Sequence, residues 1–296
     1  MAHLKSEEAE NILDYQFTVL DRGYIKLIDY MGTDERVFHA AGMSYGRDSV
    51  STTAKAEATL RSMVRNGHSS PFEQVVFTFI LKMPVFVARQ WIRHRTARLN
   101  EQSARYTEIN ESEFFVPDVN STSKRILGKG IDNYETLSFE EVQKEELRLA
   151  KRICDDIISG NTQSYLTYKE HLTNAAPREL ARVSLPVGMY TTFMWQIDLN
   201  NLMKFFSLRL DKHAQYEIRL YADMMYKIAR TVAPVTIDAF NDFILNSCRL
   251  SKTEIEKILE HLPKSVKNDV ELKPIWDRLI STNLNAYSIE KGVSIE

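Results

Sequence analysis

Alternation of apolar and polar residues predicts two strands in the first third of the chain. Between residues 74 and 83, Val75, Phe77 and Phe79 recur at every second position, which places them on one face of a strand. A similar alternation over 23–32 ends at a glycine, a common residue at a strand end. Both segments are therefore expected to lie in a sheet with one well-buried face.

Apolar spacings of three and four residues predict helices elsewhere in the chain. The expected helices cover 51–68, 85–94, 138–159, 162–173, 177–183 and 199–232, the last with a break near Asp211. Ser138 and Glu141 form a capping box, a typical signal for a helix start. Residues 117–137 are rich in Ser, Asn and Gly, so a long loop is expected there. Residues 1–16 are interpreted as a charged lead-in helix or arm, and 251–296 as a charged helical tail.

These elements favour an α/β fold of the α+β kind. A mostly antiparallel sheet, including the strand at 74–83, is expected to pack against long helices. The chain contains no internal repeat and no low-complexity tract. One domain with a helical C-terminal extension is the simplest organisation.

Composition narrows the function classes. Of 296 residues, 44% are hydrophobic, which is ample for a packed core. The formal net charge of -2 argues against a protein that mainly binds nucleic acid non-specifically. Cys154 and Cys248 lack metal-binding spacing, so neither a metal site nor a disulfide framework is expected. Without an apolar signal region or a run of about 20 apolar residues, a soluble cytoplasmic protein with no membrane contact is expected.

One segment departs from this balanced charge. Residues 85–107 contain a single carboxylate, Glu101, and five arginines: Arg89, Arg93, Arg95, Arg98 and Arg105. A charge run is usually a solvated helix face, but such a face carries acidic partners, which are missing here. The planar guanidinium fork binds phosphate and carboxylate at two points, whereas a lysine acts as a point charge. The pattern favours an anion site, and the neighbouring amide and hydroxyl side chains favour a nucleotide over inorganic phosphate.

The order of residues in this segment resembles a family signature. Arg93-His94-Arg95, seven residues, Ser103 and then Arg105 are similar to the signature of the flavin-dependent thymidylate synthases. The blocks GHSSPFEQVVFTF, PVFVARQWIRHR, PRELARVSLPVGMYTTFMW and LMKFFSLRLDKHAQYEIRLYA resemble the same family. The resemblance covers about 22–232. It implies an arm at 1–21, a catalytic domain at 22–232 and a helical extension at 233–296.

The resemblance implies FAD-dependent reductive methylation of dUMP to dTMP. It also implies methylenetetrahydrofolate as the carbon donor, NADPH as the reductant, and active sites between the subunits of a homotetramer. The implied FAD-binding residues are His68, Ser70, Arg93, His94, Arg95, Thr96, Glu101, Asp198, Leu199, Asn200 and Lys204. The implied dUMP-binding residues are Gln90, Arg93, Glu101, Gln102, Ser103, Ala104, Arg105, Arg182 and Arg209.

Arg209 is the expected catalytic residue. In the family, the matching arginine faces the uracil edge and favours loss of the N3 proton, because a fixed cation lowers the pKa of a neighbouring group that becomes an anion. His213 and Glu217 follow at four-residue intervals. We interpret them as a helix-face pair that orients Arg209 rather than as a catalytic acid. Ser103 is interpreted as a nucleotide contact rather than a nucleophile, since no base is evident beside it.

Some positions depart from the family pattern, and other functions remain open. Many relatives carry Ser at the position of Arg98 and His at those of Asn200 and Lys204, so the second flavin segment departs from the family pattern at two positions. A non-catalytic nucleotide- or flavin-binding protein on the same fold is the main alternative. An RNA-binding module ranks last, because the chain lacks a basic face and an aromatic stacking motif.

Overall fold

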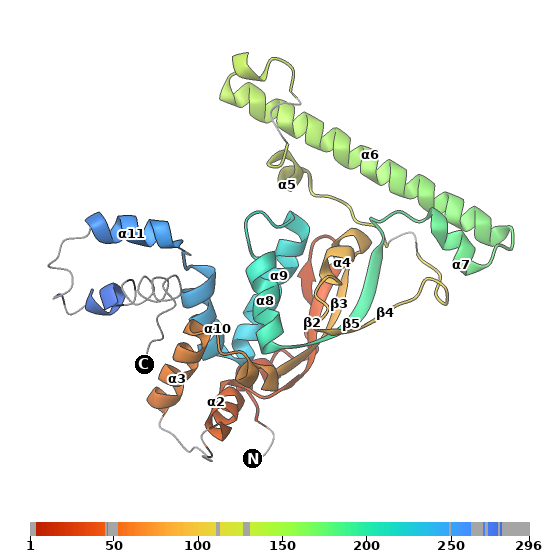
Figure 1. The fold of residues 1–296 in the computed structure, drawn as a ribbon. Coiled ribbons are helices and arrows are strands. Elements are labelled where there is room, and N and C mark those ends of the chain that lie inside the picture. Colours follow the sequence, from red (N-terminus) through yellow and green to blue (C-terminus); the bar gives the residue numbers. More distant parts are fainter. Residues whose placement is uncertain are drawn as a thin grey trace, which may run out of the picture. The chain divides into compact units, whose positions relative to one another are not determined.

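A five-stranded sheet organises the first unit of the chain. The strands are β1 Phe17–Val19, β2 Gly23–Met31, β3 Val76–Pro84, β4 Arg98–Glu101 and β5 Tyr190–Asp198, in the spatial order β1-β2-β3-β5-β4 (Figure 1). Every neighbouring pair is antiparallel, which confirms the predicted α+β class. The predicted strands at 23–32 and 74–83 correspond to β2 and β3, whereas β4 and β5 were not predicted as strands.

The computed structural model describes residues 4–44, 46, 53–110, 113–126, 131–248, 250–261, 269, 272–277 and 279. Two compact units are present, Met1–Leu245 and Asn246–Glu296. The boundaries expected at 21/22 and 232/233 stay predictions. In the described part of the chain, no helix has both the length and the apolar character needed to cross a membrane.

The helices confirm several predictions and correct others. Their bounds are α1 Glu7–Glu10, α2 Asp34–Met43, α3 Thr53–Arg65, α4 Val85–Trp91, α5 Val119–Ser123, α6 Phe139–Thr173, α7 Arg178–Ala181, α8 Leu199–Arg209, α9 Tyr216–Val232, α10 Pro234–Phe240 and α11 Lys252–His261. Short 3₁₀ or π turns are η1 Ser70–Gln74, η3 Tyr134–Thr136, η4 Arg182–Ser184 and η5 Asn241–Leu245. The break predicted near Asp211 is confirmed, because α8 ends before it and α9 begins after it. Much of the tail predicted at 251–296 lies outside the described residues.

Two predictions about the middle of the chain were wrong. The helices expected at 138–159 and 162–173 form the single helix α6, which the predicted capping box opens. Its interior contains Gly160, which costs only about 1 kcal/mol in a helix. The next residue, Asn161, is buried and donates a hydrogen bond to the Phe115 carbonyl, so this point is anchored rather than a turn. The loop expected at 117–137 contains α5, capped by the Asp118 side chain.

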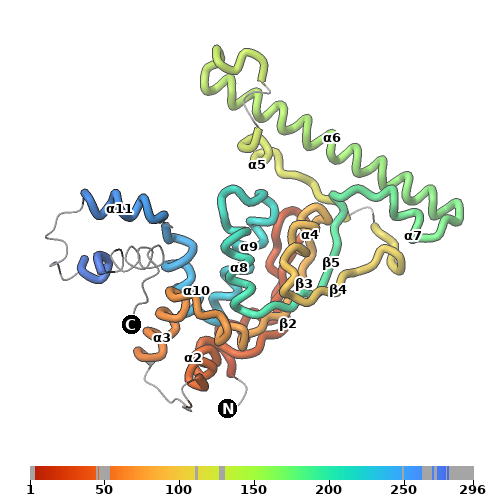
Figure 2. The backbone as a smooth tube through the Cα atoms, in the orientation of Figure 1, coloured from red at the N-terminus to blue at the C-terminus, as the bar shows by residue number. Residues whose placement is uncertain are grey.

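Helices α4 and α8 are direct continuations of neighbouring strands. Figure 2 follows the chain from β3 into α4 and from β5 into α8. Because β3 and β5 are antiparallel, these helices start at opposite ends of the strand pair. The fully buried ring of Trp91 on α4 packs at 4.4 Å from that of Phe205 on α8 and at 5.2 Å from that of Trp195 on β5. This aromatic contact brings the C-terminal ends of the two helices together.

Candidate active site

Arg209, in the last turn of α8, is held by two groups from the α4 region. Its Nε donates to His94 Nε2 at 3.0 Å, and its Nη2 donates to the Gln90 carbonyl oxygen at 3.2 Å. Phe205 lies one helical turn before Arg209, and its ring contacts the edge of the His94 ring at 4.8 Å between centroids. The same face of α8 therefore packs against the imidazole and hydrogen-bonds it.

Burial and the contact between the two side chains shift their pKa values. Burial, and then the positive charge of Arg209, lowers the pKa of His94 from 6.5 to about 4, so the ring is neutral at pH 7. Since Nε2 accepts from Arg209, the ring proton lies on Nδ1, and this N–H is available as a donor. Burial also lowers the pKa of Arg209, but an arginine remains a cation in proteins.

Most of the predicted arginine cluster lies exposed around this contact. Within the described residues, the side chains of Arg89, Arg93 and Arg95 form no ion pair and no hydrogen bond. Arg98 reaches Gln196 at 3.5 Å, and Arg105 lies 3.6 Å from a carboxylate of Glu179 on α7. The described chain thus leaves several cations without compensation, as the sequence pattern indicated.

The second half of the signature forms β4 and the turn after it. The Glu101 carboxylate accepts from the Thr191 hydroxyl at 2.6 Å, and the backbone amide of Gln102 donates to the Thr192 carbonyl on β5. The Ser103 hydroxyl accepts from the backbone amide of Arg105 at 3.2 Å. No base contacts Ser103 in the described part of the chain, which favours a binding role over nucleophilic attack. Ala104 is buried in a small cluster with Tyr168, and Arg182 is exposed in η4.

Most of the remaining predicted flavin residues lie at the start of α8 or around η1. His68 is exposed after Gly67, and Ser70 opens η1. The Asp198 carboxylate caps α8 by accepting from the backbone amide of Asn201 at 2.9 Å. The side-chain amide of the buried Asn200 donates to the Glu73 carboxylate of η1 at 3.3 Å. The Leu199 side chain lies in the core, Lys204 is exposed on α8, and Thr96 is exposed after α4. With 11 residues, α8 separates its own first residues from Arg209 by roughly 15 Å.

The interpretation of His213 was wrong. Its ring bonds Asp211 at 2.8 Å in an exposed turn, because α8 ends at Arg209 and four-residue spacing no longer places the two side chains together. His94 and the Gln90 carbonyl orient Arg209 instead, and no local periodicity connects residues 115 positions apart.

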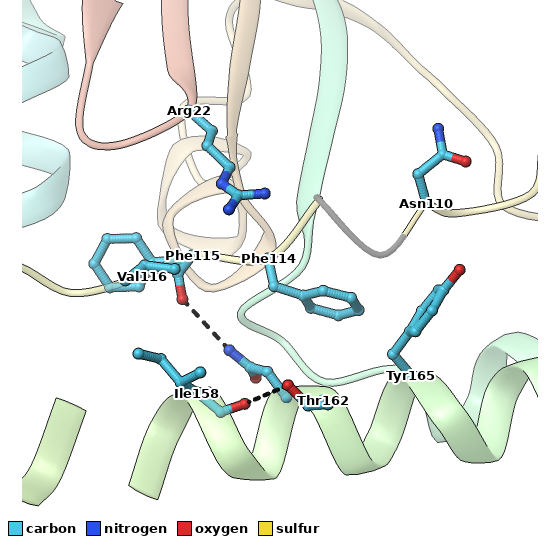
Figure 3. A pocket seen from close by; sticks show the side chains of 9 residues that line it. Arg22, Asn110, Phe114, Phe115, Val116, Ile158, Thr162 and Tyr165 are labelled. Atoms are coloured by element: carbon cyan, nitrogen blue, oxygen red, sulfur yellow. Dashed lines mark hydrogen bonds between the residues drawn. The ribbon is translucent and has the colours of Figure 1, made fainter. Parts of the chain in front are cut away.

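Two cavities of the described chain are candidate ligand sites, and one of them includes a predicted site residue. One of about 360 Å³ is lined by Ser70, Arg36 and His39, and the buried Arg36 Nε has no partner in the described chain. Sequence reasoning missed Arg36, an isolated arginine in α2. The other, of about 550 Å³, lies between α6 and the segment 114–116, with Tyr165 and Phe114 on its wall (Figure 3). Neither of these two cavities includes Arg209.

Comparisons with known proteins agree on one similarity. The model of the family described as thymidylate synthase complementing protein matches residues 26–235. The chain is 44% identical over 246 residues to a flavin-dependent thymidylate synthase of Treponema denticola, covering 83% of this chain and 89% of that protein. It is 40% identical over 252 residues to that of Wolbachia pipientis wMel, covering 85% of each. A crystal structure of the UMP/dUMP methylase PolB from Streptomyces cacaoi, bound with 5-Br dUMP, is similar with a TM-score of 0.63 and 30% identity, covering 77% of this chain and 98% of that one.

Proposed function

The chain belongs to the flavin-dependent thymidylate synthase family, and on that premise we propose that its arginine-rich segment and Arg209 hold dUMP beside FAD. The enzyme methylates dUMP to dTMP with FAD as cofactor, methylenetetrahydrofolate as carbon donor and NADPH as reductant. The observation that carries the residue assignment is the position of Arg209. His94 Nε2 and the Gln90 carbonyl hold Arg209 of α8 against the arginine-rich segment, in which Arg89, Arg93 and Arg95 have no acidic partner among the described residues.

The residues present fit a bound FAD. Arg36 Nε is buried and unpartnered in the described chain, beside Ser70, so a polar group of the cofactor would satisfy it. His94 and His68, together with Arg93 and Arg95, would supply donors to the flavin and its phosphates. When bound, FAD supplies the hydride chemistry of the reaction.

Arg209 would act on the pyrimidine through its remaining N–H groups. The two protein contacts use two of its five N–H donors and fix the plane of the guanidinium. The remaining donors would face the uracil edge and stabilise the negative charge that develops as the N3 proton is lost. Partial burial strengthens this interaction, since the surroundings screen the charge less than bulk water does.

The proposal includes a homotetramer in a cytoplasmic location, with each site completed by neighbouring subunits. Helix α6 supports self-association, because it presents apolar side chains that are 38 to 53% exposed: Leu147, Ile153, Ile157, Ile158 and Leu166. Light scattering on an Ile153→Asp, Ile157→Asp double variant should show smaller particles than wild type. An Asp156→Lys variant, an exposed position on another face of the same helix, should keep the wild-type mass.

The residue assignment is tested by separating flavin binding from turnover. Purified protein should absorb in the flavin bands and bleach with NADPH, faster when dUMP is present. Arg209→Ala should abolish dTMP formation and keep most of the flavin, whereas Arg148→Ala, which removes an exposed α6 arginine, should change neither. A colourless protein that FAD cannot reconstitute would favour the non-catalytic alternative. Loss of flavin from Arg209→Ala, with turnover restored by added FAD, would show that Arg209 is a cofactor ligand instead.

A further inference from the structure

A chain of side-chain hydrogen bonds leads from the end of α5 to Gln90. Arg125 Nη1 donates to Glu217 Oε1 at 2.6 Å. Gln215 Nε2 donates to Glu217 Oε2 at 2.8 Å, and Gln90 Nε2 donates to Gln215 Oε1. Three segments are joined in this way: the residues after α5, the start of α9, and α4.

The direction of these hydrogen bonds follows from the chemistry of the two ends. A guanidinium only donates, and an ionised carboxylate only accepts. Gln215 must therefore direct its side-chain nitrogen toward Glu217. The side-chain oxygen of Gln215 then faces Gln90. Gln90 must in turn present its nitrogen to Gln215. The side-chain oxygen of Gln90 is left as an acceptor, and in the described part of the chain no donor reaches it.

The ion pair between Glu217 of α9 and Arg125 anchors this series of hydrogen bonds. Glu217 is only 3% exposed, and a buried carboxylate is costly unless it is paired. Arg125 also lies over the Tyr216 ring at 4.8 Å, with Arg219 at 5.9 Å from the same ring. Arg219 also donates to the Lys212 carbonyl at 3.1 Å. This hydrogen bond connects α9 to the turn between Arg209 and α9.

Gln90 is also the residue whose main-chain oxygen accepts from Arg209. Holding Gln90 by its side chain consequently places two groups at once, the catalytic guanidinium and a free amide oxygen. We propose that Arg125, Glu217 and Gln215 are positioning residues that fix the Gln90 side-chain oxygen as an acceptor for a hydrogen-bond donor of the bound nucleotide. This inference rests on the proposed function, which puts Gln90 in the dUMP site. The donors available on dUMP are its N3–H and its 3′-hydroxyl.

Calorimetric titration of dUMP into the FAD-loaded protein tests the proposal. Glu217→Gln allows the amides of Gln215 and Gln90 to reverse their orientation, and Arg125→Met removes the contact that holds the Glu217 carboxylate in place. Each should raise the Kd for dUMP about three- to tenfold, the size expected for one neutral hydrogen bond. Arg125→Lys should stay within about twofold of wild type, because an ammonium also only donates. The Arg125 side chain is 38% exposed, so its variants are expected to fold. They provide the test if Glu217→Gln does not fold.

The matched control is Asp34→Asn. Asp34 has a half-buried carboxylate that accepts from the backbone amides of Val235 and Thr236 at the start of α10. Its variant should lose stability and keep the wild-type Kd. A raised Kd in this control, equal to that of Glu217→Gln, would indicate a general loss of structure and overturn the proposal.

Two dUMP analogues identify the donor. The penalty of Arg125→Met should disappear either with 3-methyl-dUMP, which lacks N3–H, or with 2′,3′-dideoxyuridine monophosphate, which lacks the 3′-hydroxyl. An undiminished penalty with both analogues, or no penalty with dUMP itself, would overturn the proposal. If the wild type does not bind dUMP, or Gln90→Ala binds it as tightly as wild type, the residue assignment of the proposed function fails instead.

Discussion

Replacing Arg209 by lysine separates the geometry of this cation from its charge. Arg209 contacts the protein through Nε and Nη2, which leaves Nη1 directed away from both protein contacts. A lysine keeps the charge but concentrates three donors on one rotating nitrogen. It cannot satisfy His94 and the Gln90 carbonyl and also present a donor in a fixed direction.

The expected effect is large for a conservative change. Removing one preorganised donor at a developing negative charge typically lowers turnover about 10²–10³-fold, or ~2.7–4 kcal/mol. Each of the two protein contacts is a hydrogen bond from a charged donor, for which about 1.5–3 kcal/mol is typical. A loss of the orienting contacts is therefore sufficient for an effect of that size. We expect Arg209→Lys to lower kcat about a hundred- to a thousandfold while FAD stays bound.

The assay is a single turnover of prereduced protein with dUMP and methylenetetrahydrofolate, in which dTMP is quantified after quenching. Bound FAD is measured by absorbance after gel filtration. Arg148→Lys on α6 is the matched control, because Arg148 is exposed and pairs only with Glu145 in the described residues. A single-turnover rate within about threefold of wild type would show that charge alone suffices. A loss of rate that follows the loss of FAD would assign Arg209 to the cofactor.

Three further outcomes concern stability. Because the pKa of His94 is lowered from 6.5 to about 4 on folding, the unfolded chain takes up this proton first as the pH falls. The unfolding free energy from urea titrations should decline between these pH values, and His94→Gln should lack that part of the decline. Gly23→Ala would place a Cβ 1.8 Å from the Tyr221 hydroxyl and should destabilise by about 1–3 kcal/mol, seen as a lower Tm; an unchanged Tm would contradict the packing. Ser138→Ala removes the cap of α6 and should cost about 1 kcal/mol in the same urea titrations, whereas no change would mean that the cap is dispensable.

Strand prediction succeeded where burial differs between the two faces of a strand. In β3, and in β2 as far as Leu27, every second residue is buried, so the alternation in the sequence predicts the strand directly. In β4 all four residues are exposed, and no apolar pattern marks them as a strand. Its pairing with β5, Leu99 opposite Trp195, depends on a segment about 90 residues later in the chain. Local composition contains no information about that partner.

The same difference between local sequence information and long-range contacts applies to the candidate site. The sequence by itself determined the uncompensated arginines, the break between α8 and α9, the capping box of α6 and the family to which the chain belongs, since each is a property of consecutive residues. Only the tertiary structure decided that His94 rather than His213 holds Arg209, and that Glu217 pairs with Arg125. The physical reason is range: helix and strand periods relate neighbours within one element. Contacts across 92 or 115 positions depend on strand register and on the aromatic packing of Trp91 against Phe205.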